Sequence, residues 1–384
     1  MTTLELTPAR MRNGTTRTAR TTAKNVILFI GDGMGPVQRR VARLSNGARA
    51  HGLAMEHLPV TGLVHTSCAD PLADVTDSAA AATALATGVK TNNGVIGLDP
   101  SGAVVPTILE LAKAAGKATG LVTTCQVTDA TPAAFGAHVP DRRDQSEIAR
   151  QFIEESGVDV ILGGGADWWR PLGQARRFPS HPLDDPAAAG LSRHGDLIER
   201  ARDHGYAAAF APDELHALPR PKAIGLFANQ ELFRQSRPGE GDHYDPPITL
   251  AELTATAIRL LSRHPDGFFL MVEEAAIDRM GHYNNARLAI QAVHELDRAV
   301  ARARKESDDA ETLLIVTADH ECGGLGFDEA VTGTELDACL SWETTGHTPV
   351  SVPLNAVGPG ANLLAGDYEN THVFAAMAAA MGLA

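Results

Sequence analysis

The chain has 384 residues, of which 44% are hydrophobic, and its formal net charge at pH 7 is −14. This length and hydrophobic content suffice for one large buried core. So negative a chain argues against nucleic acid or an anionic membrane as a partner, because both carry negative charge themselves.

The first 24 residues are rich in threonine and arginine and lack the apolar stretch of a secretory signal. We therefore expect a disordered tail over 1–24, a single domain over 25–384 and, in the absence of a visible signal, a cytoplasmic protein. No segment is apolar for long enough to span a bilayer.

Six short apolar runs, rich in β-branched residues, predict strands at 25–31, 118–124, 158–164, 267–273, 312–318 and 349–356. Continuous apolar runs of this kind are typical of strands buried on both faces of a parallel sheet. Helical patterns lie between them at 78–87, 106–116, 144–156, 249–263, 286–305 and 370–382. The alternation predicts a three-layer α/β/α sandwich with a central, mostly parallel sheet.

The segment 165–248 interrupts this alternation with scattered proline, glycine and histidine. We interpret it as an insert-like rim beside the sheet, in which Trp168 and Trp169 could select a substrate. A set of surface loops explains its composition equally well.

Acidic, basic and hydroxyl side chains gather near the predicted strand ends, where open α/β sheets bind ligands. In chain order they are Asp32, Asp129, Thr131, His138, Arg142, Glu273, Asp278, His282, Asp319, His320 and His347. Taken singly, each has an ordinary explanation as a turn, a helix cap or a surface pair. We interpret His138 as a structural histidine, whereas convergence of the others at five strand ends indicates a site.

Crowded carboxylates repel one another, and bound cations are the simplest compensation. Histidine with aspartate suits zinc, and an all-oxygen set that includes a threonine hydroxyl suits magnesium. Two cations about 4 Å apart could clamp the attacking and leaving oxygens of a phosphoryl transfer.

The stretch TDSAAAATALATG, residues 76–88, reads as a helix of small residues headed by Asp77 and Ser78. Both residue types favour the N-cap, so a plain cap is one interpretation. The other is that Ser78 is a nucleophile held at a helix N-terminus beside the cations.

The four cysteines, Cys68, Cys125, Cys322 and Cys339, are far apart and form no CxxC pair. We expect free thiols, with room for one disulfide.

The motifs GDGMG, TDSAAAATALATGVKT, DATPAAFGAHVPDR, VEEAAID, TADH and TGHT occur in the order found in alkaline phosphatases, which the chain resembles from residue 25 to 371. The resemblance implies a phosphate monoester hydrolase with two Zn²⁺ ions and one Mg²⁺ ion. A homodimer would be usual, and so would a periplasmic or secreted location.

Carried over by position, the resemblance makes Ser78 the nucleophile that forms a phosphoserine, and Arg142 a phosphate clamp steered by Asp77. The first zinc would be held by Asp278, His282 and His347. The second zinc would be held by Asp32, Asp319 and His320, beside Ser78. Magnesium would be held by Asp32, Thr131 and Glu273, with Asp129 acting on it through water.

Three features depart from the usual family pattern. Arg279 follows Asp278 and, paired with Asp129, could reach phosphate through water and alter product release. Glu274 replaces a common glycine and adds negative charge near the magnesium site. Residues 321–346 leave no room for the large insert of some relatives.

Other functions on this scaffold remain to be weighed. Alanine at positions 80 and 82 removes the C/S-x-P-x-R context of a sulfatase, and nothing indicates the phosphate return of a mutase. A phosphodiesterase, a phosphatase dedicated to one phosphorylated biosynthetic metabolite, and a metal-binding protein without turnover stay open as alternatives.

Overall fold

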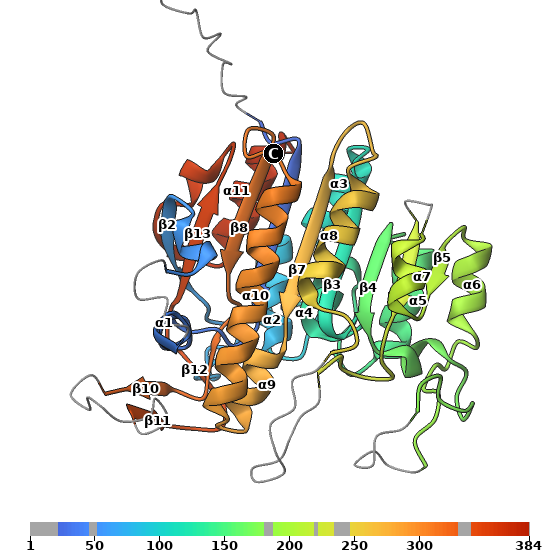
Figure 1. The fold of residues 1–384 in the computed structure, drawn as a ribbon, viewed down its shortest axis with the longest axis horizontal. Coiled ribbons are helices and arrows are strands. Elements are labelled where there is room, and N and C mark those ends of the chain that lie inside the picture. Colours follow the sequence, from blue (N-terminus) through green and yellow to red (C-terminus); the bar gives the residue numbers. More distant parts are fainter. Residues whose placement is uncertain are drawn as a thin grey trace, which may run out of the picture.

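The computed structural model describes residues 22–45, 52–179, 187–218, 222–233, 246–328 and 339–383. Ten strands of this part of the chain form one sheet in the order β14-β2-β13-β8-β1-β7-β3-β4-β6-β5 (Figure 1). The predicted tail lies almost wholly outside the described residues.

The strands of the large sheet are β1 (Asn25–Gly31), β2 (Val60–His65), β3 (Ala118–Gln126), β4 (Val160–Gly164), β5 (Ala207–Ala209), β6 (Ala223–Leu226), β7 (Phe268–Glu274), β8 (Thr312–Thr317), β13 (Val352–Val357) and β14 (Gly366–Glu369). Two small antiparallel pairs join β9 (Glu321–Cys322) to β12 (His347–Thr348) and β10 (Leu325–Phe327) to β11 (Leu340–Trp342).

The centre of the sheet is parallel: β1 pairs with β7 on one side and with β8 on the other, and β3 follows β7. All residues of β3, β7 and β8 are buried, as their continuous apolar runs predict. The strand β13 runs antiparallel to both of its neighbours, β8 and β2.

Helices cover both faces of the sheet. The α-helices are α1 (Pro36–Ser45), α2 (Ser78–Thr87), α3 (Ile108–Ala114), α4 (Ala130–Gly136), α5 (Gln145–Glu154), α6 (Leu197–Asp203), α7 (Pro212–His216), α8 (Leu250–Leu261), α9 (Ala276–His282), α10 (Ala286–Glu306) and α11 (Thr371–Met381). Figure 1 shows α8 and α10 side by side in front of the sheet, with α2, α3 and α4 behind it. Within the described residues, none of the helices combines the length and the apolarity that crossing a bilayer requires.

The alanine-rich helix α2 is buried at every position and packs against α4 and α11. Asp77 caps its N-terminus, since one carboxylate oxygen accepts the Ala80 backbone N–H at 2.9 Å. Gly88 ends it with a left-handed φ of 73°. The small side chains allow close packing around the helix, which fixes the place of Ser78 in its first turn.

The six predicted strands and six predicted helices all occur, with ends shifted by a few residues. Four strands of the large sheet were not predicted, namely β2, β5, β6 and β14, and neither were the short strands β9 to β12. Of these, β5 and β6 lie within the segment 165–248 and extend the same sheet beyond β4. The division of the chain into tail, domain and rim stays a prediction.

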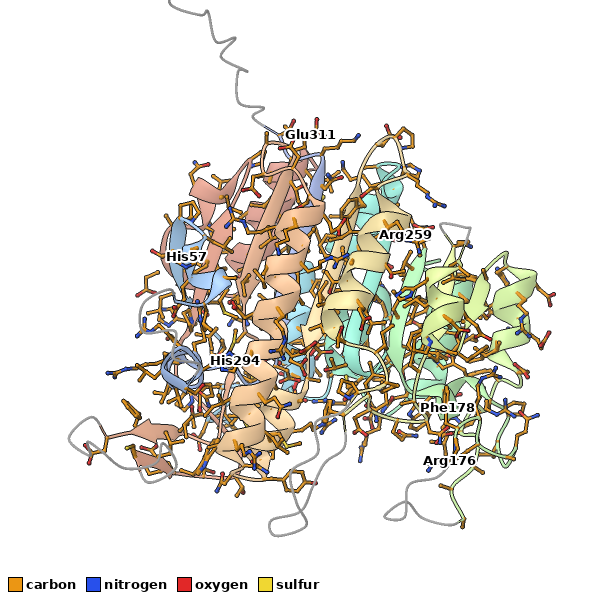
Figure 2. All side chains as sticks on the ribbon, viewed as in Figure 1. His57, Arg176, Phe178, Arg259, His294 and Glu311 are labelled. Atoms are coloured by element: carbon orange, nitrogen blue, oxygen red, sulfur yellow. The ribbon has the colours of Figure 1, made fainter. Side chains whose placement is uncertain are left out.

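One expectation needs correction. The ring of Trp169 is fully buried in the core, so it cannot touch a substrate, and Trp168 is only partly exposed. Two other residues of this segment, Arg176 and Phe178, lie on the side of the molecule where the central strands end, near the part of the sheet beyond β4 (Figure 2). All four cysteines are free thiols, so the expected thiols are confirmed and the disulfide is absent.

Candidate active site

The site lies where β1, β7 and β8 end in the sheet and where α2 begins. Asp32 directly follows β1, and its backbone N–H donates to the Glu274 carbonyl at the end of β7. Asp319 and His320 follow β8, and Asp319 Oδ1 accepts the Gly33 backbone N–H at 3.1 Å. Parallel strands therefore deliver residues distant in sequence to one edge.

Ser78 points from the first turn of α2 into this edge. Its Oγ lies 3.1 Å from His320 Nε2. The same nitrogen lies 3.2 Å from Asp319 Oδ2 and 3.5 Å from Asp32 Oδ1. A hydroxyl, an imidazole and two carboxylates thus face one another in the interior.

A second group forms around Asp278 on α9. Its two carboxylate oxygens each lie 3.3 Å from an imidazole Nε2, one from His282 and one from His347. The Nδ1 atoms of these rings lie against backbone carbonyls, His282 with Thr345 at 2.6 Å and His347 with Thr76 at 2.8 Å. When Nδ1 donates its hydrogen to a carbonyl, the lone pair of Nε2 is available to bind a cation. This is the arrangement of metal-bound histidines.

A third group contains oxygen donors. Glu273, the last residue but one of β7, has a buried carboxylate that accepts a hydrogen bond from the Thr123 hydroxyl. Thr131, in the first turn of α4, lies close enough to lower the pKa of Glu273, yet its Oγ1 has no well-formed hydrogen bond among the described residues. An all-oxygen group of this kind suits magnesium.

Two arginines share the carboxylate of Asp129. Arg142 donates to Asp129 Oδ1 at 3.0 Å and to Asp77 Oδ2 at 3.2 Å, and Arg279 donates to Asp129 Oδ2 at 2.8 Å. The charges of Arg142 and Arg279 hold the pKa of Asp129 below its usual value despite burial. The guanidinium of Arg142 is therefore oriented by two carboxylates before any ligand arrives.

The other acids of the site have too few positively charged neighbours to balance their own negative charge. Burial and the charges of Asp319, Asp278 and Glu273 raise the pKa of Asp32 well above its usual range. Burial, with Asp278, raises the pKa of Asp319 to about 6, and burial raises the pKa of Glu273 to about 7. Bound cations would lower all three, because opposite charge favours the ionised form.

The buried polar atoms that lack hydrogen bonds support cation binding. Among the described residues, Asp32 Oδ1, Asp278 Oδ1, Asp319 Oδ2 and Thr131 Oγ1 are buried without such a partner. Buried polar groups are ordinarily satisfied, so each calls for a ligand. Donor atoms of Asp32, Asp278 and His320 also lie within 4.8 Å of one another. These donors fit zinc near His320 and Asp278.

The candidate residues named from the sequence are brought together here, with one expected exception. His138 lies apart from them, where its Nδ1 meets the Gly97 carbonyl at 2.7 Å and its Nε2 meets Glu110 at 2.9 Å. It joins the chain after α4 to Gly97 and to Glu110 on α3, which is a structural role. Glu274 accepts from the Thr124 hydroxyl and the Ala276 N–H, and so holds the turn between β7 and α9.

Three further residues near the site were not predicted from the sequence. Glu321 accepts from Gln38, Thr348 and the backbone of Gly324, and so supports the strands that carry His320 and His347. Glu231 is a largely buried acid whose pKa burial raises and Arg279 lowers. Cys322 lies beside Asp278. The letters ECGG after His320 were visible, but nothing in their spacing indicated these contacts.

The family model for alkaline phosphatase matches residues 23–335. This chain belongs to the alkaline phosphatase family. Alkaline phosphatase 4 of Bacillus subtilis is 35% identical over 78% of this chain and 62% of its own length, and alkaline phosphatase of Escherichia coli is 35% identical over 94% and 86%. Streptomycin-6-phosphate phosphatase of Streptomyces griseus is 34% identical over 96% of this chain and 93% of its own length.

The alkaline phosphatase fold is shared with solved structures. The enzyme of the Antarctic bacterium TAB5 superposes with a TM-score of 0.76 and 29% identity, over 94% of this chain and 98% of that one. A variant of the TAB5 enzyme was solved with Mg bound in its M3 site. As a member of this family, the chain is a phosphate monoester hydrolase, and the family's dependence on metal ions agrees with the donor groups described above.

Proposed function

We propose that this alkaline phosphatase hydrolyses phosphate monoesters through a covalent phosphoserine at Ser78, with two Zn²⁺ ions and one Mg²⁺ ion. The observation that carries the proposal is the 3.1 Å separation of Ser78 Oγ and His320 Nε2. It suits two neighbouring ligands of one zinc ion as well as it suits a hydrogen bond, since tetrahedral ligands at about 2.0–2.1 Å lie about 3.3 Å apart.

The donors divide into three sets. Asp278, His282 and His347 would hold the first zinc, and Asp32, Asp319 and His320 the second. Asp32, Thr131 and Glu273 would hold magnesium. When bound, these cations supply Lewis acidity that favours the ionised serine and water oxygens and offsets negative charge in the transition state.

The substrate phosphate is bound by the side chain of Arg142. Its guanidinium is fixed by Asp77 and Asp129, and a planar fork of donors matches two phosphate oxygens. This contact places phosphorus over Ser78 Oγ, at the positive end of the α2 helix dipole. Arg279, on the other oxygen of Asp129, would reach the phosphate through water and alter product release.

Two displacements complete turnover. Ser78 Oγ attacks phosphorus, the bond from phosphorus to the ester oxygen breaks, and the alcohol leaves with a proton. A water oxygen then attacks the phosphoserine, the bond between phosphorus and Oγ breaks, and Ser78 regains its hydrogen as phosphate departs. Burial and the neighbouring His347 lower the pKa of His320, so its ring stays neutral and one ring nitrogen keeps a lone pair that can bind a cation.

A second candidate is a phosphatase dedicated to one phosphorylated metabolite. The similarity to the streptomycin-6-phosphate phosphatase extends over nearly the full length of both chains, which favours it. We also propose that the partners are small phosphate esters and not nucleic acid or membranes, because the net charge is −14. A homodimer remains a further proposal.

The test is a panel of a chromogenic phosphate monoester, phosphorylated metabolites, a phosphate diester and a sulfate ester. We expect monoester hydrolysis that a chelator abolishes and that added Zn²⁺ and Mg²⁺ restore. Faster diester cleavage would replace the proposal by a phosphodiesterase. A preference of more than about 100-fold in kcat/KM for one metabolite, about 2.7 kcal/mol, would favour the dedicated enzyme.

A further inference from the structure

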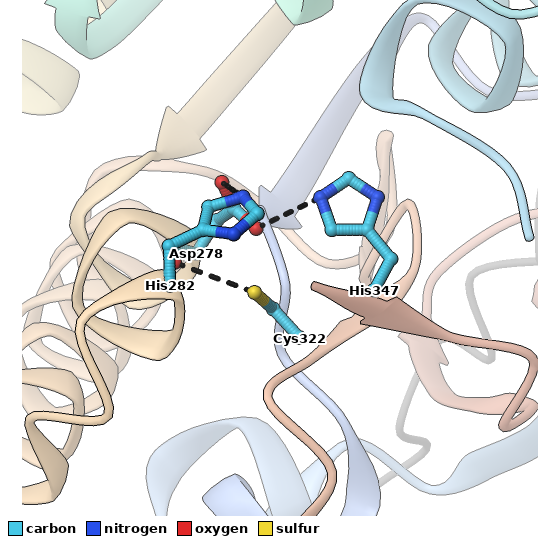
Figure 3. A group of neighbouring side chains, drawn as sticks. All are labelled: Asp278, His282, Cys322 and His347. Carbon is cyan, nitrogen blue, oxygen red and sulfur yellow. Dashed lines mark hydrogen bonds and ion pairs between the residues drawn. The ribbon is translucent and has the colours of Figure 1, made fainter. Parts of the chain in front are cut away.

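Cys322 lies in the wall of the first proposed zinc site. It occupies β9, which pairs with β12 so that Cys322 is directly opposite His347. Figure 3 shows its sulfur facing the group formed by Asp278, His282 and His347. The side chain is fully buried, and Sγ lies 3.5 Å from the backbone carbonyl of Asp278.

The donor atoms of these four residues form one cluster. One atom of each, from Asp278, His282, Cys322 and His347, lies within 4.8 Å of the corresponding atom of every other. Asp278 Oδ1 is buried and lies 3.3 Å from His347 Nε2, but it accepts no hydrogen bond among the described residues, which indicates a missing ligand.

Two glycines leave room for the sulfur. A Cβ at Gly281 would lie 3.0 Å from Cys322 Sγ, and a Cβ at Gly33 would lie 3.0 Å from Cys322 Cβ. A side chain at either position would press on the thiol. The glycines therefore permit Sγ to lie next to the ligands of α9.

We propose that Cys322 Sγ is a fourth protein ligand of the cation bound by Asp278, His282 and His347. The inference rests on the proposed first zinc site. On binding, the sulfur–hydrogen bond gives way to a sulfur–metal bond and the proton passes to solvent. The ligand set of one sulfur, two nitrogens and one carboxylate oxygen suits a thiophilic cation such as Zn²⁺ or Co²⁺ and disfavours Mg²⁺.

A sulfur ligand has a consequence for the coordination sphere. Four protein donors complete a tetrahedron, whereas catalytic zinc sites keep a position for water or substrate. With Cys322 as a ligand, water or substrate would have to occupy a fifth position or displace the thiolate.

Cobalt provides a direct test. The protein is stripped of metal and titrated with Co²⁺, and the near-ultraviolet band of a thiolate–cobalt charge transfer is recorded. We expect the band in the unmodified protein, its loss in Cys322→Ser, and its retention in Cys68→Ser. Cys68 is a matched control because its sulfur lies outside the cluster, near the Asp70 carbonyl.

X-ray absorption of the unmodified zinc protein gives a second readout that needs no variant. We expect one sulfur at about 2.3 Å among nitrogen and oxygen ligands. Metal uptake without a sulfur neighbour, or a cobalt band that persists in Cys322→Ser, would overturn the inference and leave the proposed function intact. Failure of the unmodified protein to take up Zn²⁺ or Co²⁺ would overturn both.

Discussion

Ser78 Oγ and His320 Nε2 lie 3.1 Å apart although 242 positions separate the two residues in the chain. The contact exists because α2 begins beside the carboxyl end of β8. Burial keeps the histidine neutral, and the alanines of α2 leave the serine little freedom to move. This pair is the point from which the chemistry can be tested.

Ser78→Ala should abolish the phosphoenzyme and leave a folded protein that still binds zinc. The substitution removes one oxygen and adds no bulk at the head of α2. Labelling with a radioactive phosphate ester and acid quenching measures the intermediate. Normal turnover in this variant would rule out covalent catalysis at Ser78. Ser101→Ala, in an exposed turn, should label normally.

Arg142→Ala should weaken inhibition by inorganic phosphate roughly 10- to 100-fold, since hydrogen bonds to charged groups contribute about 1.5–3 kcal/mol. The measurement is the inhibition constant. Arg143→Ala is a matched control, because this exposed neighbour pairs with Asp141 outside the site. An inhibition constant unchanged by Arg142→Ala would count against the clamp.

Asp278→Ala or His347→Ala should each cost one equivalent of zinc, because either change removes a donor from the first site. Elemental analysis after gel filtration measures the loss. His294→Ala should keep all equivalents, since His294 lies on α10 and bonds to Ser45 (Figure 2). Full zinc content in both site variants would mean that the ligands are wrongly assigned.

Gly33→Ala should destabilise the fold and weaken metal binding. Gly33 has a left-handed φ of 73°, and an added Cβ would lie 2.7 Å from the Asp278 backbone. Gly102→Ala is the control. Gly102 also has a left-handed φ, of 86°, so alanine strains the backbone there too, but an added Cβ would lie in open space. We expect weaker zinc binding in Gly33→Ala alone, measured by competition with a chromophoric chelator. Equal binding in the two variants would contradict the clash.

His138→Gln should lower the free energy of unfolding more at about pH 5.5 than at about pH 9. Burial lowers the pKa of His138, but its hydrogen bonds to Glu110 and to the Gly97 carbonyl outweigh this effect and raise the pKa above its usual value of 6.5. A raised pKa stabilises the fold fully below the unfolded value and ceases to do so as pH rises through the folded value.

Urea unfolding at the two pH values measures this difference. His204→Gln, at an exposed helix end, should change stability equally at both. A His138→Gln effect that grows with pH would reverse the sign and refute the argument.

The central strands could be predicted because each is an apolar run buried on both faces, and the site because its residues follow those runs. The strand β2 was missed because it is half-exposed and contains Thr61 and Gly62, so it forms no continuous apolar run. The edge strand β14 is largely exposed and contains Asp367 and Glu369. The strands β2 and β14 join the sheet through β13, and no local sequence pattern reveals this long-range pairing.

The resemblance paired Asp77 with Arg142 and Asp129 with Arg279, and the structure contains both contacts, but it did not predict the bond from Arg142 to Asp129. It did not predict the proximity of Cys322 to Asp278. That contact lies where α9 packs against β9, a strand of two residues whose short pairing with β12 also sets Cys322 opposite His347. So short a ladder carries no periodicity that a sequence could display.

The position of β13 also governs when the protein can become active during synthesis. This late strand is the bridge between β2 and β8, so the early strand β2 has no neighbour in the sheet until residue 357 has left the ribosome. His347 emerges only shortly before it. Nascent chains shorter than this lack His347 or the bridging strand, so we expect no hydrolysis from them.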